Sequence, residues 1–374
     1  MIGQPKDGVR PFVENPFFHR KPIKDHRYFF GRTEETRRAL HLLRNGECIS
    51  IVGPRRIGKT SLLFHLCDPQ VQQEHDLGDE YVFVYINCEG LGNLGKSHFY
   101  QLLWKEIKVA VAGGRAERWG EGISDFKGLR EALKAIRRKG GKLALFFDEF
   151  ETIAQNPNFD QDLFSDLRSL VSTSTLVYAT ASQDALYDLT YVGESALSSP
   201  FFNVFTEIPL GFLKPGEAKE MVPGLLRIVN QGDLFTEGDL DFVFDAGGYF
   251  PFFLQLVCDR LFEQKGEHKD LAVSDYEHVR KRYAADAEPH FHYMWRNLDA
   301  GERDAVQVVC EGKVNELADE HKQRLERKCI LHEDAIFSSV FAEFVRRQVG
   351  ESRTGKTRRL AIRSVLDRLR ELHW

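Results

Sequence analysis

The chain has 374 residues, enough for two or three domains and at least one sizeable hydrophobic core. Hydrophobic residues make up 42% of the sequence and charged residues 29%, which excludes a disordered or a fibrous protein. The formal net charge of -5 argues against a surface built as a whole to grip nucleic acid, although a local basic patch is compatible with it.

The sequence carries no sign of secretion or of membrane insertion. No apolar run is long enough to span a bilayer, and the N-terminus has no signal-peptide pattern. The six cysteines are scattered without a C-x-x-C pair, and several lie inside apolar runs. We therefore expect a cytoplasmic protein with buried thiols and no membrane partner.

The first half of the chain alternates between strand and helix patterns. Residues 1–28 are rich in Pro, Lys and Arg and are expected to form an extended arm, and a surface helix is predicted over Thr33–Arg44. Short β-branched or aromatic runs then alternate with helical patterns, which is typical of a parallel sheet covered on both faces. This predicts an α/β domain over residues 29–210. The predicted strands are residues 48–52, 81–86, 143–147, 176–179 and 203–208.

After Pro209 the strand patterns stop and helical spacing takes over. Four helical patterns predict a helical lid domain over residues 211–290, with a capping box at Ser274 and Glu277. Asp299 and Glu302 mark another helix start, followed by a helical stretch and two short strand patterns. This order predicts a winged-helix-like domain over residues 291–348 and a basic helix over residues 349–374.

The strongest functional motif lies directly after the first predicted strand. Residues 53–60 match the phosphate-binding pattern G-x-x-x-x-G-K-[ST]. In such a loop the backbone N–H groups point inward and the next helix adds the positive end of its dipole, so a polyphosphate is the natural ligand. Lys59 is expected to reach the β and γ phosphates, and the Thr60 hydroxyl to bind Mg²⁺. The expected nucleotide-binding residues of this motif are Gly53, Pro54, Arg55, Arg56, Ile57, Gly58, Lys59, Thr60 and Ser61.

A second motif ends the apolar run at residues 143–147. Asp148 follows this strand at the carboxyl edge of the sheet, where open α/β sheets bind their ligands, and is expected to hold Mg²⁺. Glu149 is expected to orient and deprotonate an attacking water. A strand followed by a solvated acidic turn is the alternative for these residues alone. Their pairing with the phosphate loop favours a nucleotide site.

Further segments are similar to those of one family. Residues 29–35 read Phe-Phe-Gly-Arg-Thr-Glu-Glu, and residues 199–205 and 247–255 also match its motifs. Together with the phosphate loop and the acidic strand end, they resemble the bacterial novel-STAND group of P-loop ATPases, relatives of AAA+ and archaeal initiator-like ATPases. The resemblance covers roughly residues 15–348.

The resemblance implies a P-loop NTPase sheet, ATP or ADP with Mg²⁺ as ligands, and further site residues. Phe30, Gly31 and Arg32 would border adenine, Ser182 would sense the γ-phosphate, and Pro251 would contact the nucleotide. Two positions depart from the family pattern. Gln183 follows Ser182 where many members carry arginine, and the family's Gly-x-Pro element is one residue longer here. A strand-end cap explains Ser182 equally well, and a proline that opens a helix explains Pro251.

The resemblance further implies a slow ATPase that works as a molecular switch in signalling or defence. STAND proteins usually add an effector domain and a sensor array, for which this sequence shows no counterpart, so a separate protein partner or self-assembly is expected. Two alternatives stay open. One is a DNA-associated AAA+ ATPase, an initiator, loader or transposition regulator that uses the winged helix and basic tail, and the other is a non-hydrolysing, ADP-bound scaffold.

The C-terminal stretch is the candidate DNA contact. Its cations also suit an amphipathic helix that docks on protein, or a solvated face. A metal site at His290 and His292 has no matching ligands at metal-binding spacing. The cations are Arg346, Arg347, Arg353, Lys356, Arg358, Arg359, Arg363, Arg368 and Arg370.

Overall fold

The computed structural model describes residues 14–17, 20–77, 81–112, 122–173, 176–190, 201–267 and 270–350. The chain divides into two compact units. We call the first the sheet unit, formed by Lys21–Leu213 and Gln323–Ile330. The second, the helical unit, contains Lys214–Lys322 and the described residues 14–17, 20 and 331–350. The predicted basic helix lies outside the described residues beyond residue 350.

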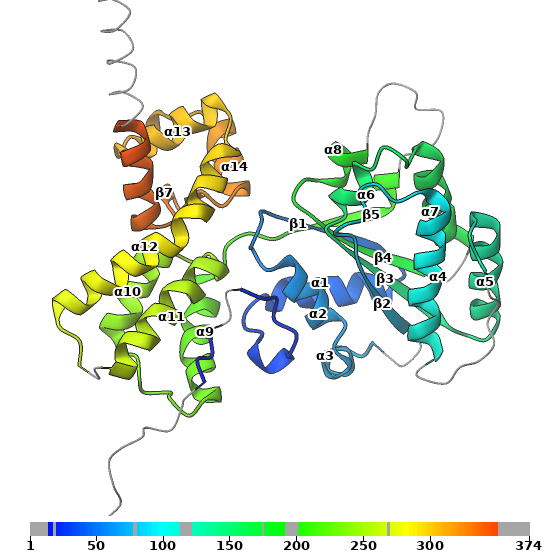
Figure 1. Ribbon diagram of the computed structural model, residues 1–374, viewed down its shortest axis with the longest axis horizontal. Helices are drawn as coiled ribbons and strands as arrows, with labels where there is room; N and C mark the ends of the chain where they lie inside the picture. The colour runs from blue at the N-terminus through cyan, green and yellow to red at the C-terminus, as the bar shows by residue number, and fades with distance from the viewer. Residues whose placement is uncertain are drawn as a thin grey trace, which may run out of the picture. The chain divides into compact units, whose positions relative to one another are not determined.

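A five-stranded parallel sheet forms the centre of the sheet unit (Figure 1). The strand order is β2-β3-β4-β1-β5, so the strand that leads into the phosphate loop lies between β4 and β5. The predicted parallel sheet is confirmed. The strands are β1 (Cys48–Val52), β2 (Tyr81–Asn87), β3 (Lys142–Asp148), β4 (Leu176–Ser182) and β5 (Phe205–Pro209).

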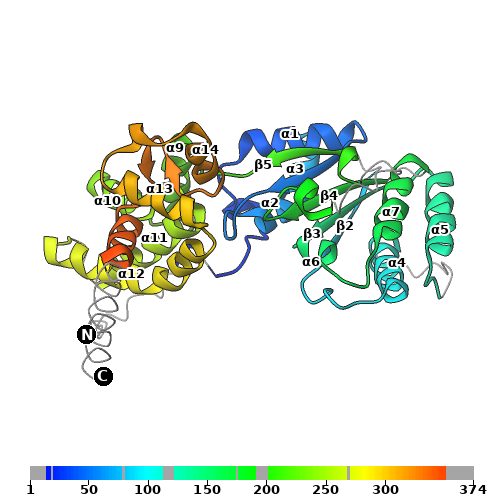
Figure 2. The same cartoon turned by 90° about the horizontal axis from the view of Figure 1, so that it is seen from above.

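Helices cover both faces of this sheet. Helices α1 and α2 pack on one face, while α4, α5 and α7 lie on the other (Figures 1 and 2). Right-handed crossovers explain which face each helix covers. The chain first crosses from β1 to β2 at the edge of the sheet and then returns through β3 and β4 to β5, so the connections before and after β2 lie on opposite faces. The helices are η1 (His26–Tyr28), α1 (Thr33–Arg44), α2 (Lys59–Leu66), α3 (Pro69–Glu74), α4 (Lys96–Ala112), α5 (Phe126–Arg138), α6 (Glu151–Ala154), α7 (Gln161–Thr173), α8 (Leu186–Thr190) and η2 (Phe201–Val204).

The middle strands form the core of the sheet unit. Every residue of β4 is buried, and β3 is buried from its second residue to its last, as continuous apolar runs between two helical layers require. At the edge, β5 begins later than predicted, because residues 201–204 form the turn η2 instead. The ring of Phe201 stacks on Phe150 with centroids 5.8 Å apart. This contact joins η2 to the turn that follows β3.

The helical unit contains the elements predicted after the sheet, in the same order. The helix start predicted at Asp299 and Glu302 is confirmed, and the two residues form a capping box there. The predicted box at Ser274 is wrong, because the helix already starts at Val273 and the Asp275 carboxylate accepts from the Ala272 N–H at 2.8 Å. The elements after β5 are α9 (Pro215–Ile228), α10 (Glu237–Gly247), α11 (Pro251–Glu267), α12 (Val273–Arg296), α13 (Ala300–Cys310), η3 (Val314–Glu316), α14 (Asp319–Arg327), β6 (Leu331–His332), β7 (Ala335–Ile336) and a helix over residues 339–350. Of α14, the residues from Gln323 onward are grouped with the sheet unit.

A buried charged pair joins the helices of this unit. Lys265 of α11 lies 2.5 Å from a carboxylate oxygen of Asp239 in α10, with exposed side-chain fractions of 4% and 0%. The hydroxyl of Tyr276 in α12 donates to the same carboxylate at 2.8 Å. Burial favours the neutral acid, but these donors outweigh it and lower the pKa of Asp239. The buried Asp239 carboxylate therefore links α10, α11 and α12.

Helix α12 runs without a break through the predicted boundary at residues 290 and 291, so one helix serves both predicted domains. After it come α13, α14 and the antiparallel pair β6–β7, the order expected of a winged helix, an assignment that stays a prediction. Within the described parts of the chain, no helix is both long and apolar enough to cross a membrane.

Candidate functional site

Two glycines shape the loop between β1 and α2. A Cβ on Gly53 would lie 2.4 Å from the carbonyl oxygen of Leu210, so no larger residue fits there without a backbone shift. Gly58, directly before α2, has a φ of 104°, in the left-handed region that glycine adopts most readily. The loop is thus closed against the end of β5 and then turned sharply into the helix.

Lys59 is the first residue of α2, and its side chain is folded back over the loop. Its Nζ donates to the carbonyl oxygens of Gly53 at 2.7 Å and Pro54 at 3.1 Å, and only 7% of the residue is exposed. Burial lowers the pKa of Lys59, whereas the nearby charges of Glu151, Glu149 and Asp148 oppose that shift. A buried cation therefore lies among carboxylates at the end of the sheet.

Asp148 ends β3 and is 3% exposed. One carboxylate oxygen accepts from the N–H of Glu149 at 3.1 Å, and the other accepts from the Tyr85 hydroxyl at 2.8 Å. Glu149 itself has a φ of 54°, which is unusual for a residue other than glycine. Such strained backbone is often retained where a side chain must be aimed. The turn here separates Asp148, in the sheet, from Glu149 beyond it.

Two residues not expected from the sequence join this site. Glu151 begins α6, and its carboxylate accepts from the side-chain amide of Gln183 at 3.1 Å. Burial raises the pKa of Glu149, and repulsion from Glu151 and Asp148 raises it further, against the attraction of Lys59. Gln183, at the position where many family members carry arginine, therefore hydrogen-bonds an acid that raises the pKa of Glu149. The acidic run Asp-Glu-Phe-Glu at residues 148–151 was the available sequence signal for Glu151.

Ser182 ends β4 beside the phosphate loop. Its backbone carbonyl accepts from the N–H of Gly53 at 3.2 Å, and its hydroxyl donates to the carbonyl of Asp184 at 2.7 Å. The side chain has no exposed surface. These contacts are those of a strand-end cap, which was the alternative interpretation of Ser182. Its role in sensing the γ-phosphate stays a prediction.

Arg32 lies in the expected element but contacts backbone carbonyls. Gly31 and Arg32 both have left-handed backbone, with φ of 75° and 61°, and make the turn that starts α1. The guanidinium, in a residue that is 3% exposed, donates to the carbonyls of Ile57 at 3.3 Å, Gly211 at 2.5 Å and Phe212 at 3.1 Å. Arg32 thus joins the phosphate loop to the segment that follows β5. The neighbouring Phe30 is half-buried.

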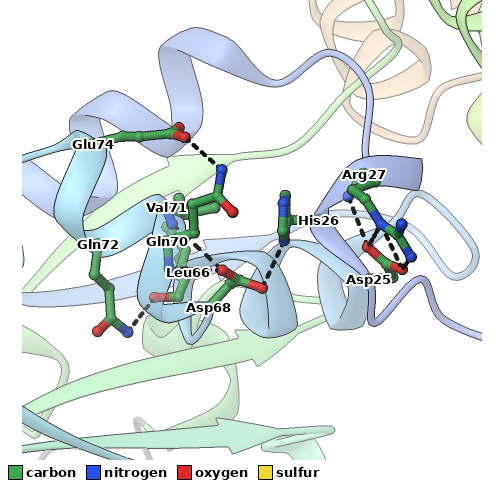
Figure 3. Close-up of polar contacts among 9 residues, drawn as sticks. All are labelled: Asp25, His26, Arg27, Leu66, Asp68, Gln70, Val71, Gln72 and Glu74. Carbon is green, nitrogen blue, oxygen red and sulfur yellow. Dashed lines mark hydrogen bonds and ion pairs between the residues drawn. The ribbon is translucent and has the colours of Figure 1, made fainter.

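The N-terminal arm lies along α2. The Ile23 N–H donates to the Ser61 hydroxyl at 3.0 Å, and the Phe29 ring stacks on His65 with centroids 4.0 Å apart. One turn further, Nδ1 of His26 lies 3.0 Å from Asp68, whose other carboxylate oxygen caps α3 (Figure 3). Ser61 and His65 share one side of α2, and Asp68 lies between α2 and α3. The arm therefore contacts the helix that carries Lys59 and Thr60, and it occupies the hydroxyl of Ser61.

Comparisons with known proteins agree with this geometry. Residues 45–315 match the sequence profile of the family described as Novel STAND NTPase 2. The chain belongs to this family. None of the curated protein sequences matches it at a significant level.

A Walker-type ATPase is among the solved structures that are similar to this chain. The Walker-type ATPase of Pyrococcus abyssi is similar over 88% of this chain and 99% of its own, with a TM-score of 0.62 and 15% identity. The ORC2 protein of Aeropyrum pernix has a TM-score of 0.49 and 13% identity over 88% of this chain and 90% of its own. The Pyrococcus structure shows that this novel STAND NTPase shares the α/β fold of P-loop ATPases.

The remaining expected residues of the NTPase lie in different surroundings. Arg55 and Arg56 are exposed on the loop, whereas Ile57 is buried. Pro251 opens α11 in the helical unit, as a proline at the start of a helix does, and its contact with a nucleotide stays a prediction.

The donors at the loop suit a hard divalent cation. Mg²⁺ binds to proteins through one or two carboxylates or hydroxyls and completes its shell with phosphate oxygens and water. Thr60 and Asp148 supply donors of this kind next to the phosphate loop. Across the described residues, no group of three or more His, Cys, Asp or Glu side chains is arranged to hold a metal ion alone. The residues present thus fit a metal that arrives with a nucleotide.

The close approach at Gly53 leads to the first prediction. Gly53→Ala should lower the free energy of unfolding by about 1–3 kcal/mol, the usual cost of overpacking, because the new methyl group meets the Leu210 carbonyl. Equilibrium urea unfolding of the full chain measures this. Gly211→Ala is the matched control, since a Cβ there meets no atom within 4 Å. Equal stability of the two variants would contradict the close approach.

Proposed function

We propose that this chain is an ATP-binding and slowly hydrolysing switch, which works through a separate protein partner or through self-assembly. The observation that carries the proposal is the buried Lys59 ammonium at the start of α2, beside the charges of Asp148, Glu149 and Glu151. A cation placed among acids at the mouth of a glycine-bearing loop matches the needs of a phosphate–metal complex.

Each residue has a role in this proposal. Lys59 leaves the loop carbonyls and binds the β and γ phosphates of ATP. Thr60 and Asp148 hold Mg²⁺, which neutralises phosphate charge when bound. Glu149 accepts the proton of the attacking water, and its raised pKa brings it closer to the pH at which it works.

The switch also needs a path from the nucleotide to the rest of the chain. Arg32 supports one, because its guanidinium bonds both the phosphate-loop carbonyl of Ile57 and the carbonyls of Gly211 and Phe212. The chain leaves the sheet unit directly afterwards, at Leu213. A shift of the loop on nucleotide binding would pull on this exit segment. Such coupling of a phosphate site to a connecting segment is a common basis of nucleotide switches.

The partner is proposed from the family rather than from a contact. Switch ATPases of the STAND type act on other protein segments, and this chain is proposed to act on a separate protein or on further copies of itself, in signalling or defence. We propose a cytoplasmic location on the same ground.

The role of Lys59 gives the second prediction. Lys59→Ala should weaken Mg-ATP binding by about 10- to 100-fold, because hydrogen bonds to charged groups contribute about 1.5–3 kcal/mol. Isothermal titration with Mg-ATP measures the affinity. Lys219→Ala, which changes an exposed lysine of α9, is the control. Unchanged affinity in Lys59→Ala would overturn the site.

The third prediction concerns turnover. Glu149→Gln should keep ATP bound while lowering the single-turnover rate by about 100-fold or more, as expected when a general base is lost. Radiolabelled ATP mixed with excess protein measures both steps, with Glu220→Gln of α9 as an exposed control. Turnover at the parent rate would remove Glu149 from this role. A parent protein that purifies with ADP and shows no turnover would support the scaffold instead.

A DNA-associated ATPase is the second candidate. It is supported by the order of α13, α14 and the β6–β7 hairpin, which is that of a winged helix, and by the basic C-terminal stretch. The structure of Drosophila ORC bound to DNA has a TM-score of 0.47 and 12% identity to this chain.

The fourth prediction separates this candidate from the switch. If the chain binds DNA through its tail, the affinity for DNA should fall steeply as the salt concentration rises. The double variant Arg358→Gln, Arg359→Gln should reduce the slope of log affinity against log salt by the amount that corresponds to about two phosphate contacts. Fluorescence anisotropy with duplex DNA at several salt concentrations measures the slope. DNA binding that is absent, or insensitive to salt, favours the switch.

A further inference from the structure

Tyr85 is the one side chain that hydrogen-bonds the Asp148 carboxylate within the described residues, although nothing in its sequence context marked it. Its hydroxyl donates to the Asp148 Oδ2 at 2.8 Å. The other oxygen accepts the backbone N–H of Glu149 at 3.1 Å. Both oxygens are therefore restrained, one by the chain itself and one by a side chain from another strand.

The register of the sheet places Tyr85 beside Asp148. Tyr85 of β2 pairs with Phe146 of β3, and Asn87 pairs with Asp148. Side chains two positions apart on a strand share a face, so Tyr85 and Asp148 lie on the same side of neighbouring strands. This diagonal separation is one that a long aromatic side chain spans.

The ring of Tyr85 is also in contact with α2. It packs against Phe64 with ring centroids 4.6 Å apart. Phe64 lies one helical turn after Thr60, so both residues are on the same side of α2. Tyr85 thus contacts the strand that carries Asp148 and the helix that carries Thr60, the two elements proposed to supply Mg²⁺ ligands.

We propose that Tyr85 is a positioning residue that orients the Asp148 carboxylate toward nucleotide-bound Mg²⁺. The inference rests on the proposed function. A neutral hydroxyl selects one orientation of the carboxylate without cancelling its charge, whereas a cation in the same place would compete with the metal. Hydrogen bonds of this kind behind a metal ligand typically change metal affinity by about 10- to 100-fold.

The test removes the hydroxyl and keeps the ring. A fluorescent ATP analogue is titrated into the full chain in EDTA and then at increasing Mg²⁺. Mg²⁺ is expected to strengthen binding of the analogue, and Tyr85→Phe should raise the Mg²⁺ concentration that gives half of this effect by about 10-fold. The affinity of Tyr85→Phe for the analogue in EDTA should equal that of the parent. The matched control is Tyr81→Phe, on the same strand, whose hydroxyl donates to the Leu43 carbonyl at 2.9 Å and should leave both values at the parent level.

A second measurement reads the metal directly. Mn²⁺ in place of Mg²⁺ is titrated into the nucleotide complex and its free concentration is followed by electron paramagnetic resonance, so that no turnover is needed. In an Asp148→Asn background, Tyr85→Phe should cause no further loss, because the hydroxyl acts through the carboxylate.

Three results would overturn the inference. The first is a Tyr85→Phe variant whose Mg²⁺ dependence equals that of the parent. The second is a Tyr85→Phe variant that loses as much affinity for the analogue in EDTA as in Mg²⁺, which indicates a packing role. The third is a double variant in which the losses of Mn²⁺ affinity from Tyr85→Phe and Asp148→Asn add up. A parent chain that binds the analogue no better with Mg²⁺ than with EDTA would instead refute the metal part of the proposed function, and the role of Tyr85 with it.

Discussion

The burial of the Lys59 ammonium is the constraint around which the phosphate-loop region of the sheet unit is arranged. A cation removed from water is costly unless it is paired and hydrogen-bonded. The carbonyls of Gly53 and Pro54 accept its protons, and the acids at the end of β3 and the start of α6 balance its charge. The charge of Lys59 therefore links the loop to β3 and α6. A polyphosphate with a metal would satisfy the same charges.

Helix α2 connects the phosphate loop to several neighbouring segments. It begins with Lys59, its Phe64 supports Tyr85 behind Asp148, and its Ser61 and His65 hold the N-terminal arm. On the other side of the loop, the carbonyl of Ile57 is bonded by Arg32, which also holds the chain after β5. A change at the loop would be felt at these contacts, since packed elements shift together rather than deform singly.

Local patterns predicted the local elements well. Thr33–Arg44 and Cys48–Val52 have the predicted bounds, because residue spacing alone signals their amphipathic and apolar character. The capping box predicted at Ser274 was wrong because several neighbouring residues can cap a helix. Asp275 caps a helix that starts earlier than predicted. The length of α12 was also missed, although Tyr283, Ala287 and Phe291 are buried at helical spacing across the expected boundary.

The sequence by itself determined the parallel sheet, the phosphate loop with Lys59 and Thr60, and the acidic strand end with Asp148 and Glu149, since each is defined by neighbours along the chain. Only the tertiary structure decided which backbone carbonyls Arg32 bonds and which side chains support the acids. Arg32 bonds carbonyls about 180 residues away, and Tyr85 reaches Asp148 through the register of two strands. Such contacts depend on the pairing of distant segments, which no local pattern encodes.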